Sequence, residues 1–541
     1  MTATFDVLTH ALTGSHLVEA SAGTGKTFNI TTLVVRLLAE SGLTIEHILV
    51  VSFARASTAD LRGRVRERIV EAIAAFETGR SDDSVLLALA LRGDRGVGLE
   101  RLRAGLRDFD RAAIYTIHSF CQRALVEFAF ESGEPFAVEF VEGADAMYEE
   151  VSRDYWATKA YEADPAWLAD DTVKKVLDGP KSLVDLVKHA AERPELRLIP
   201  EKPAVGAEPD LEHIALQRDL HDVARARLDA TKNLHNIRAY SDLLVRLADA
   251  MRGPGGPTLC DALFKRFPAA LIDEFQDTDP VQFSVFQQVY RGGRGALFLI
   301  GDPKQAIYAF RGGDIYAYLR AVRDSPPTTL GINFRSDQPL VEAVGMLYER
   351  APAPFVDARI PFHPVDADKG IRIRGPSGET APLQIRMLRK ANKGAKGRIT
   401  VGWADTGLAP LIAADIVRFL KSDARILRGR SRENGSENGS ETGSENGSEV
   451  WTAPRPSDCA ILVRKNKDAE RLQRALAKLG VPSVVTSDTS VFQSDAAADL
   501  LAVLDAIVHP ASDRRLRSAV TGRIIGLSAN DLAVAVADEA A

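Results

Sequence analysis

Short runs of apolar residues recur along the first 335 positions, and each is flanked by segments with helical spacing. Continuous apolar runs of this kind predict strands that are buried on both faces, as in a parallel sheet between two layers of helices. The runs are HLVE (16–19), HILVVSF (47–53), AIYTIH (113–118), AALID (269–273) and ALFLIGD (296–302). We therefore expect an α/β fold in this part of the chain.

The pattern changes between positions 122 and 262, where charged residues and helical spacing dominate and strand-like runs are few. The segment DLEHIALQRDLHDVARARLDATKNL (210–234) is typical of this region. It predicts a helical insertion that divides the first α/β domain into two parts, 1–121 and 263–335.

A tandem tract, ENGSENGSETGSENGSE, occupies positions 433–449. Its period-four mixture of Gly, Ser, Asn and Glu cannot build a core, so it predicts a flexible, solvated loop. A second α/β pattern follows: strand-like CAILVRK (459–465), helix-like KDAERLQRALAKLG (467–480) and strand-like PSVVT (482–486). We expect 336–541 to contain the start of a second α/β domain.

Composition sets broad limits on the class of protein. The chain has 541 residues, 45% of them hydrophobic, which is enough for several cores. The three cysteines, Cys121, Cys260 and Cys459, lie far apart without a C-x-x-C pair, so the pattern argues against a disulfide framework and a cysteine zinc site. The net charge of -6 does not indicate a nucleic-acid binder, so any contact with nucleic acid must come from a local surface strip.

The start of the chain, MTATFDVLTH, has neither a basic segment nor a long apolar run, and no stretch of about 18 apolar residues occurs. We expect no export signal and no membrane span. Together with the cysteine usage, this predicts a cytoplasmic location.

A phosphate-binding loop is predicted after the first apolar run, in the segment ASAGTGKT. It matches the P-loop pattern except that alanine replaces the first glycine. Backbone N–H groups from Gly23 to Lys26 would cradle phosphates, Lys26 would reach the β- and γ-phosphates of ATP, and Thr27 would complete a Mg²⁺ shell. The alternative is a glycine turn that only starts a helix. The predicted nucleotide-binding residues are Ala20, Ser21, Ala22, Gly23, Thr24, Gly25, Lys26 and Thr27.

A P-loop needs an acidic partner at the end of another strand, and LIDEFQDTDP (271–280) supplies one. Asp273 would hold Mg²⁺ through water, while Glu274 would act as general base on the attacking water. A solvated acidic strand end is the alternative, although ligands bind at this edge in such folds.

The segment LIGDPKQAIYAFRGGD (299–314) carries a further set of candidates. Gln305 could hydrogen-bond the γ-phosphate or its attacking water, and Tyr308, Phe310 and Arg311 offer aromatic faces and a cation to a stacked base. Aromatic residues of this kind are more often part of a core, which is the alternative.

Arg335 lies at the end of a predicted strand in GINFRSD (331–337). It is a candidate for stabilising charge on the transferred phosphate. A surface arginine or an ion pair is the alternative.

Together with VVSFARASTADLRGRV (50–65) and IYTIHSFCQ (114–122), these stretches occur in an order that resembles the UvrD/Rep-type superfamily 1 helicases. Within them, the chain resembles the RecB-like subunits of bacterial RecBCD (exodeoxyribonuclease V) helicase-nucleases. The resemblance implies a RecA-like P-loop motor domain (1A), a helical insertion (1B-like) and the start of a second RecA-like domain. It also implies ATP-driven movement on single-stranded DNA in double-strand-break repair and recombination, with duplex-end DNA and RecC-like and RecD-like subunits as partners.

The resemblance also implies contacts with single-stranded DNA along two segments. Their candidate residues are Phe53, Ala54, Arg55, Thr116, His118 and Phe120. Without the resemblance, His118 would be interpreted as a satisfied histidine in a core or at a strand end.

The chain also departs from the family pattern. We find no TIHxSKGLE-like or VALTRA-like segment, and no D-Y-K-like nuclease site. We therefore expect the amino-terminal part of a RecB-like protein, with an incomplete second motor domain at 336–541. The leading hypothesis is a helicase motor subunit, and the second is a catalytically incomplete fragment that binds ATP and DNA. An unrelated P-loop ATPase or kinase is disfavoured by the long separation between Lys26 and Asp273.

Overall fold

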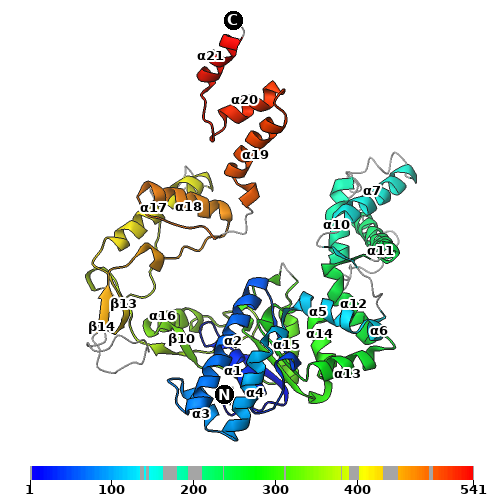
Figure 1. The fold of residues 1–541 in the computed structure, drawn as a ribbon, viewed down its shortest axis with the longest axis vertical. Helices are drawn as coiled ribbons and strands as arrows, with labels where there is room; N and C mark the ends of the chain where they lie inside the picture. Colours follow the sequence, from blue (N-terminus) through cyan, green and yellow to red (C-terminus); the bar gives the residue numbers. More distant parts are fainter. Residues whose placement is uncertain are drawn as a thin grey trace. The chain divides into compact units, whose positions relative to one another are not determined.

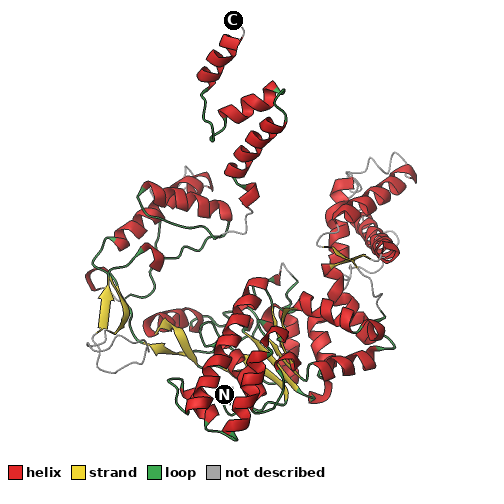
Figure 2. Cartoon of the chain, viewed as in Figure 1, coloured by secondary structure: helices red, strands yellow, loops and turns green. Residues whose placement is uncertain are grey.

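The computed structural model describes most of the chain, and its elements are drawn in Figures 1 and 2. The described residues are 3–133, 139–141, 145–162, 180–192, 210–235, 237–309, 312–378, 381–388, 401–430, 449–486 and 491–539. The chain divides into two compact units, one reaching from Met1 to Ile371 and the other holding most of the chain from Arg372 onwards. None of the described helices combines the length and apolar character that a membrane crossing requires.

A seven-stranded parallel sheet forms the centre of the first unit, with the strand order β1-β9-β2-β8-β7-β3-β4. The strands are β1 (Ala3–Thr4), β2 (Gly14–Glu19), β3 (Ile48–Ser52), β4 (Ile114–Thr116), β7 (Ala269–Ile272), β8 (Ala296–Gly301) and β9 (Thr328–Thr329). All five apolar runs predicted as strands lie in this sheet, and the α/β fold class is confirmed. The run at 113–118 is shorter than predicted, because Ile117 and His118 already belong to the next helix.

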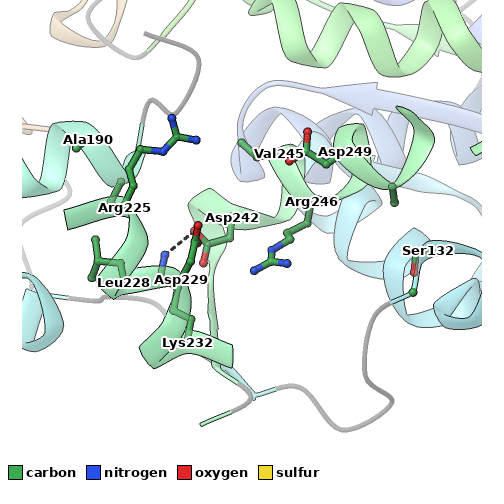
Figure 3. Close-up of a pocket in the computed structure, with 13 residues that line it drawn as sticks. Ser132, Ala190, Arg225, Leu228, Asp229, Lys232, Asp242, Val245, Arg246 and Asp249 are labelled. Atoms are coloured by element: carbon green, nitrogen blue, oxygen red, sulfur yellow. Dashed lines mark hydrogen bonds and ion pairs between the residues drawn. The ribbon is translucent and has the colours of Figure 1, made fainter. Parts of the chain in front are cut away.

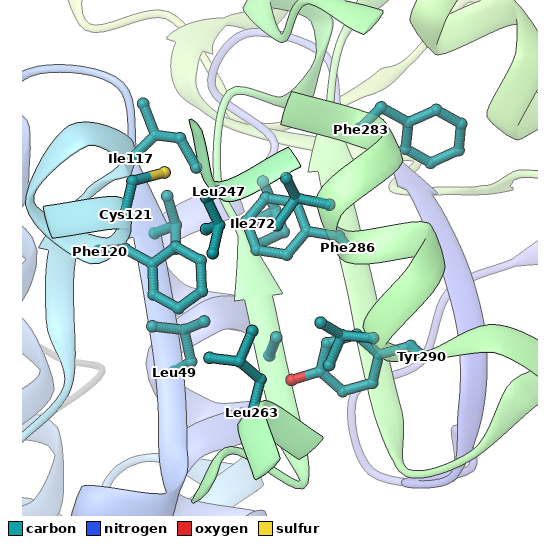
Figure 4. Packing of buried hydrophobic residues seen from close by; sticks show 14 of the residues in the cluster. Leu49, Ile117, Phe120, Cys121, Leu247, Leu263, Ile272, Phe283, Phe286 and Tyr290 are labelled. Carbon is teal, nitrogen blue, oxygen red and sulfur yellow. The ribbon is translucent and has the colours of Figure 1, made fainter. Parts of the chain in front are cut away.

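Helices cover both faces of the sheet, because its strands are apolar on both sides. Along β3, Ile48 and Val50 pack into one core, while Leu49 and Val51 pack into the other. The first core includes residues of α1 (Lys26–Ala39), α2 (Arg55–Thr78), α3 (Ser84–Ala90) and α4 (Arg95–Arg107). The second includes residues of α5 (Ile117–Glu127), α12 (Tyr240–Arg252), α13 (Gly256–Arg266), α14 (Pro280–Val289) and α15 (Ile315–Asp324). Figure 4 shows Phe120 and Phe286 in this second core, whose ring centroids lie 5.9 Å apart.

A smaller helical group has a core of its own. It consists of α7 (Asp145–Glu162), α10 (Pro180–Glu192) and α11 (Asp210–His235), with a parallel pair of strands, β5 (Glu139–Val141) and β6 (Ile237–Ala239). The buried Tyr155 donates a hydrogen bond to Asp219 at 2.8 Å and ties α7 to α11. The predicted insertion, 122–262, also contains α6 (Ala129–Ser132), α12 and the first part of α13. The apolar residues of α12 and α13 pack on the sheet. Its boundaries stay a prediction.

The segment that carries Arg335 forms β10 (Ile332–Asp337), which pairs with β11 (Asp366–Lys369) in a separate two-stranded sheet. The helix α16 (Gln338–Glu349) follows β10. A strand was predicted here, and its separation from the large sheet was not.

The second unit contains an antiparallel sheet of β12 (Ile373–Arg374), β13 (Arg425–Arg430) and β14 (Glu449–Thr452). Its helices are α17 (Val401–Leu420), α18 (Asn466–Lys478), α19 (Asp495–Val508), α20 (Asp513–Thr521) and α21 (Ala529–Glu539). The predicted helix at 467–480 is confirmed as α18, which buries Leu472 and Leu476. Of the tract 433–449, only Glu449 belongs to the described residues, so the predicted flexible loop lies outside them.

The strands predicted at 459–465 and 482–486 are wrong, since neither run has strand structure. Leu462 and Val484 are almost fully exposed. An apolar run becomes a strand only where a neighbouring strand takes up its backbone hydrogen bonds and a layer covers its side chains. Neither condition is met here among the residues that the structure describes.

Replacing Phe286 by alanine tests the core between α14 and the sheet. We expect a loss of about 3–5 kcal/mol in the free energy of unfolding, because the change removes a fully buried ring and leaves a cavity. Urea unfolding followed by circular dichroism measures the effect. The matched control is Phe130→Ala, since Phe130 is exposed and its loss should change stability by less than about 0.5 kcal/mol. Equal losses in both variants would contradict the assigned core.

Candidate nucleotide site

A glycine-rich turn connects β2 to α1 at the carboxyl edge of the sheet. Ala20, Ser21, Ala22, Gly23, Thr24 and Gly25 form the turn, and Lys26 and Thr27 are the first residues of α1. Gly23 and Gly25 have φ of +81° and +86°, in the left-handed region that side chains with a Cβ rarely adopt. The Ala20 N–H donates to the Gly301 carbonyl at 2.9 Å, which fastens the turn to β8. The turn thus leads directly into the amino-terminal end of a helix, the place in a fold where phosphates bind.

Lys26 forms an ion pair with Glu274, in which Nζ lies 2.7 Å from Oε2. Glu274 follows β7 and has φ of +52°, a strained conformation for a residue with a side chain. Its N–H donates to the Asp273 carboxylate at 2.9 Å, and the Asp273 N–H donates to the Val51 carbonyl at 2.8 Å. The structure therefore brings together the lysine and both carboxylates that the sequence predicted.

Asp273 has an altered affinity for protons. Burial, together with the nearby negative charge of Glu274, raises the pKa of Asp273 to about 6, although Lys26 opposes the shift. The same two causes raise the pKa of Asp277 to about 6. Burial disfavours the charged form of such a carboxylate. A cation bound nearby would favour the charged form and lower the pKa again.

Gln305 ends a short 3₁₀ helix, Pro303–Gln305, directly after β8. Its amide donates to Asp302 Oδ2 at 2.7 Å. The Asp302 N–H donates to the side-chain oxygen of Gln276 at 2.9 Å, and the Gln276 amide donates to Glu274 Oε2 at 2.8 Å. Gln305 and Glu274 thus belong to one hydrogen-bonded chain, and sequence reasoning did not identify Gln276 as its middle member.

Arg335 lies beside the P-loop although its strand belongs to another sheet. The Phe334 N–H donates to the Gly23 carbonyl at 2.8 Å, and the Asn333 amide donates to the Ala22 carbonyl at 2.9 Å. A Cβ added at Gly23 would lie 2.8 Å from the Cβ of Arg335, so this approach also requires glycine. The structure therefore brings Arg335 to the predicted phosphate site.

Two exposed aromatic residues, Phe28 and Phe334, flank the P-loop, and sequence reasoning missed both. A Cβ added at Gly25 would lie 3.8 Å from the Phe28 Cβ and 3.8 Å from a Phe334 ring carbon. The Arg68 guanidinium lies over one face of Phe28, 4.4 Å from the ring centroid, so the other face and the Phe334 ring are the surfaces that suit a nucleotide base. Their positions in the sequence could have identified them, since Phe28 directly follows GKT and Phe334 directly precedes Arg335.

Several DNA-contact candidates lie at helix starts on the same edge of the sheet. Phe53 and Tyr308 stack with ring centroids 5.1 Å apart and an interplanar angle of 27°. Ala54 precedes α2 and Arg55 is its first residue. Thr116 caps α5 by accepting from the Ser119 N–H, and His118 is exposed in the first turn of α5. Phe310 and Arg311 lie outside the described residues. The DNA-binding role of this set stays a prediction.

Phe120 requires a correction. It is only 2% exposed and packs between Phe267 and Phe286 beneath the sheet. This position rules out a direct contact with DNA while the core is intact, and it gives Phe120 a packing role in α5. Its neighbour His118, by contrast, is exposed two residues after the end of β4, so it is not a core histidine, while a histidine at a strand end remains the alternative to a DNA contact.

A cavity of about 360 Å³ lies where the helical group meets α12, and Figure 3 shows its lining. None of the predicted site residues lines it. Lys232 forms a buried ion pair with Asp242 at 2.7 Å, and Asp242 also accepts from the Ala239 N–H at the start of α12. The lining contains three basic residues and three acidic residues, so its formal charges balance and do not favour an anion. They are Arg225, Lys232 and Arg246, and Asp229, Asp242 and Asp249.

Comparisons with known proteins agree with the motif order. The UvrD/REP helicase N-terminal domain matches residues 2–326, and the UvrD-like helicase C-terminal domain matches residues 448–534. The chain is 32% identical over 536 residues to the RecBCD enzyme subunit RecB of Mycobacterium tuberculosis, covering 96% of this chain and 44% of the relative. It is 34% identical over 521 residues to that of Mycolicibacterium smegmatis, covering 96% and 44%, and 31% identical over 651 residues to that of Escherichia coli, covering 99% and 53%. The chain therefore spans about half the length of these curated relatives.

The raised pKa of Asp273 predicts a dependence of stability on pH. Because the pKa of about 6 in the folded state exceeds the ordinary aspartate pKa of 3.8, the folded state binds the proton more tightly, and stability falls as pH rises from 4 to 6. We expect Asp273→Asn to recover about 1–3 kcal/mol at pH 7.5 and little at pH 4. Urea unfolding at both pH values measures this. Asp277 adds a slope of the same sign, so the variant should flatten the profile without abolishing it. If the pH dependence of stability were the same in Asp273→Asn and the wild type, the raised pKa of Asp273 would be refuted.

Proposed function

The chain belongs to the UvrD/REP helicase family, and from this premise we propose that it is the motor-bearing part of a RecB-like helicase subunit. It hydrolyses ATP to move along single-stranded DNA in double-strand-break repair and recombination. The observation that carries the proposal is the convergence of Lys26, Glu274 and Arg335 around one P-loop. The names of the relatives support the biological setting.

In the proposed reaction, the phosphates of ATP take the place of the Glu274 carboxylate at Lys26. The released carboxylate then accepts a proton from the attacking water as general base. Gln305 orients that water or the γ-phosphate, and Arg335 stabilises the negative charge that develops on the transferred group. Without nucleotide, Lys26 and Glu274 therefore neutralise each other, and they separate when nucleotide binds.

The nucleotide cofactor fits the residues present. Thr27 and Asp273 offer a hydroxyl and a carboxylate, the hard oxygen ligands that Mg²⁺ takes alongside nucleotide phosphates. The raised pKa of Asp273 is consistent with a carboxylate that becomes charged when a cation is near. When bound, Mg²⁺ would neutralise phosphate charge. Phe334, and the face of Phe28 that Arg68 leaves open, would contact the base.

Coupling to DNA is proposed to run through the stacked pair of Phe53 and Tyr308. Phe53 directly follows β3, whose Val51 carbonyl holds the Asp273 N–H, and Tyr308 lies three residues after Gln305. A displacement of either hydrolysis group would therefore move a ring that bases can stack on. Ala54, Arg55, Thr116 and His118 would line the same track.

The domain assignment is part of the same proposal: 1–121 and 263–335 as domain 1A, 122–262 as the 1B-like insertion, and 336–541 as an incomplete second motor domain. RecC-like and RecD-like chains are the proposed partners, because the relatives are named as subunits of the RecBCD enzyme. A second candidate is a fragment that binds ATP and DNA without turnover. It is favoured by the fact that the chain spans about half the length of its relatives.

Steady-state ATP hydrolysis, with and without single-stranded DNA, separates the two candidates. We expect DNA to stimulate hydrolysis, and we expect Glu274→Gln to reduce kcat by at least about 100-fold because the amide cannot accept a proton. ATP binding without turnover in the wild type would favour the second candidate. Hydrolysis that survives Glu274→Gln would refute the assigned base.

Replacing Lys26 by alanine tests the phosphate site itself. We expect ATP affinity to fall by at least about 10-fold, since a charged contact to phosphate is lost, while circular dichroism stays unchanged. Equilibrium binding of a fluorescent ATP analogue measures the loss. The control is Lys265→Ala on α13, outside the site, which should bind ATP as the wild type does. A folded Lys26 variant with unchanged affinity would exclude the P-loop assignment.

A further inference from the structure

Lys304 lies between two acidic residues at the carboxyl ends of neighbouring strands. Its Nζ is 2.6 Å from Glu19 Oε1 and 2.8 Å from Asp302 Oδ1. The three side chains are 9%, 7% and 3% exposed, respectively. Glu19 is the last residue of β2 and directly precedes the P-loop, while Asp302 directly follows β8. The ammonium group thus joins the strand that enters the P-loop to the segment that carries Gln305.

The charge on Lys304 is maintained in this buried position. Burial alone lowers the pKa of an ammonium group, but the charges and hydrogen bonds of Asp302 and Glu19 outweigh it, so the pKa of Lys304 is raised. The parallel register, which pairs Glu19 with Gly301, keeps both carboxylates at the same edge. Without the ammonium group, two buried carboxylates would face each other uncompensated.

Asp302 has further partners through its other polar atoms. Its second oxygen, Oδ2, accepts from the Gln305 amide at 2.7 Å, and its N–H donates to Gln276, which in turn donates to Glu274. The orientation of this one carboxylate therefore affects both the residue proposed to contact the γ-phosphate and the partner of the proposed base. Lys304 holds that carboxylate from the opposite side.

We propose that Lys304 is a positioning residue for recognition of the γ-phosphate. By holding Asp302 next to Glu19, it fixes the orientation of the Gln305 side chain. The inference rests on the proposed function, since it assumes that Gln305 contacts the γ-phosphate. Lys304 itself is buried away from solvent and acts through Asp302. Its loss therefore affects recognition of a triphosphate and leaves recognition of a diphosphate, which has no γ-phosphate, nearly unchanged.

The primary test compares the affinities of the 541-residue chain for a non-hydrolysable ATP analogue and for ADP, by titration calorimetry. In Lys304→Met, which keeps much of the side-chain volume, we expect about 10-fold weaker binding of the analogue and ADP binding within about twofold of the wild type. Lys304→Arg retains a cation for both carboxylates and should restore analogue binding to within about threefold. Equal weakening for both nucleotides, or no rescue by arginine, would overturn the proposal.

A double-mutant cycle tests whether Lys304 acts through Gln305. If it does, Lys304→Met combined with Gln305→Ala should bind the analogue no more weakly than Gln305→Ala alone. Multiplied losses would show that Lys304 acts independently of Gln305 and would overturn the positioning role.

A crystal structure of Lys304→Met gives a readout that needs no nucleotide. We expect Asp302 to rotate away from Glu19 and its hydrogen bond with the Gln305 amide to break. An intact Asp302–Gln305 bond would overturn the proposal even if the nucleotide site works as proposed. Conversely, loss of that bond in a chain whose wild type binds no nucleotide would support the clamp while refuting the proposed function.

Discussion

The parallel register of β2, β8 and β7 is the constraint on which the rest of the first unit depends. It places Glu19 opposite Gly301 and Ile272 opposite Leu299, so the three strands end at one edge. Residues far apart in the sequence meet there because parallel strands present their carboxyl ends together. The P-loop, the acidic pair after β7 and the segment after β8 are all consequences of this alignment.

The same alignment creates an electrostatic problem, because the carboxylates of Glu19, Glu274 and Asp302 gather at one edge of the sheet. Two lysines compensate them: Lys26 at Glu274, and Lys304 between Glu19 and Asp302. The two ion pairs differ in exposure, since Glu274 is 34% exposed whereas the partners of Lys304 are nearly inaccessible. A ligand can therefore displace the first pair, while the second keeps its partners.

Local sequence was sufficient for the central strands and the P-loop. A buried strand between helices has an apolar pattern that depends little on its partners, and GTGKT owes its shape to glycines within the turn itself. Where structure depends on distant partners, the predictions were incomplete. The runs at 459–465 and 482–486 have the composition of strands without a pairing strand, and Phe120 looked like a DNA contact although its ring points into the core.

Lys304 and Gln276 escaped sequence reasoning for a related reason. A lysine after GDP and a glutamine after DEF look like ordinary polar residues. The register of β8 with β2 shows that Lys304 joins separate motifs, and the register of β8 with β7 shows the same for Gln276. Asn333 is similar, since its contact with Ala22 crosses between two sheets.

The hydrogen-bonded chain has a mechanical consequence for the proposed motor. Gln305 and Tyr308 are three residues apart on one connection, and Tyr308 stacks on Phe53 at the end of β3. The same β3 fixes Asp273 through the Val51 carbonyl. Asp273 and Gln305, both proposed to act at the nucleotide, are therefore each joined to the aromatic pair, one through β3 and the other through the segment after β8. Both links are short and begin in the sheet, whose packing is rigid. A rearrangement at the proposed phosphate site would therefore also displace the stacked rings of Phe53 and Tyr308.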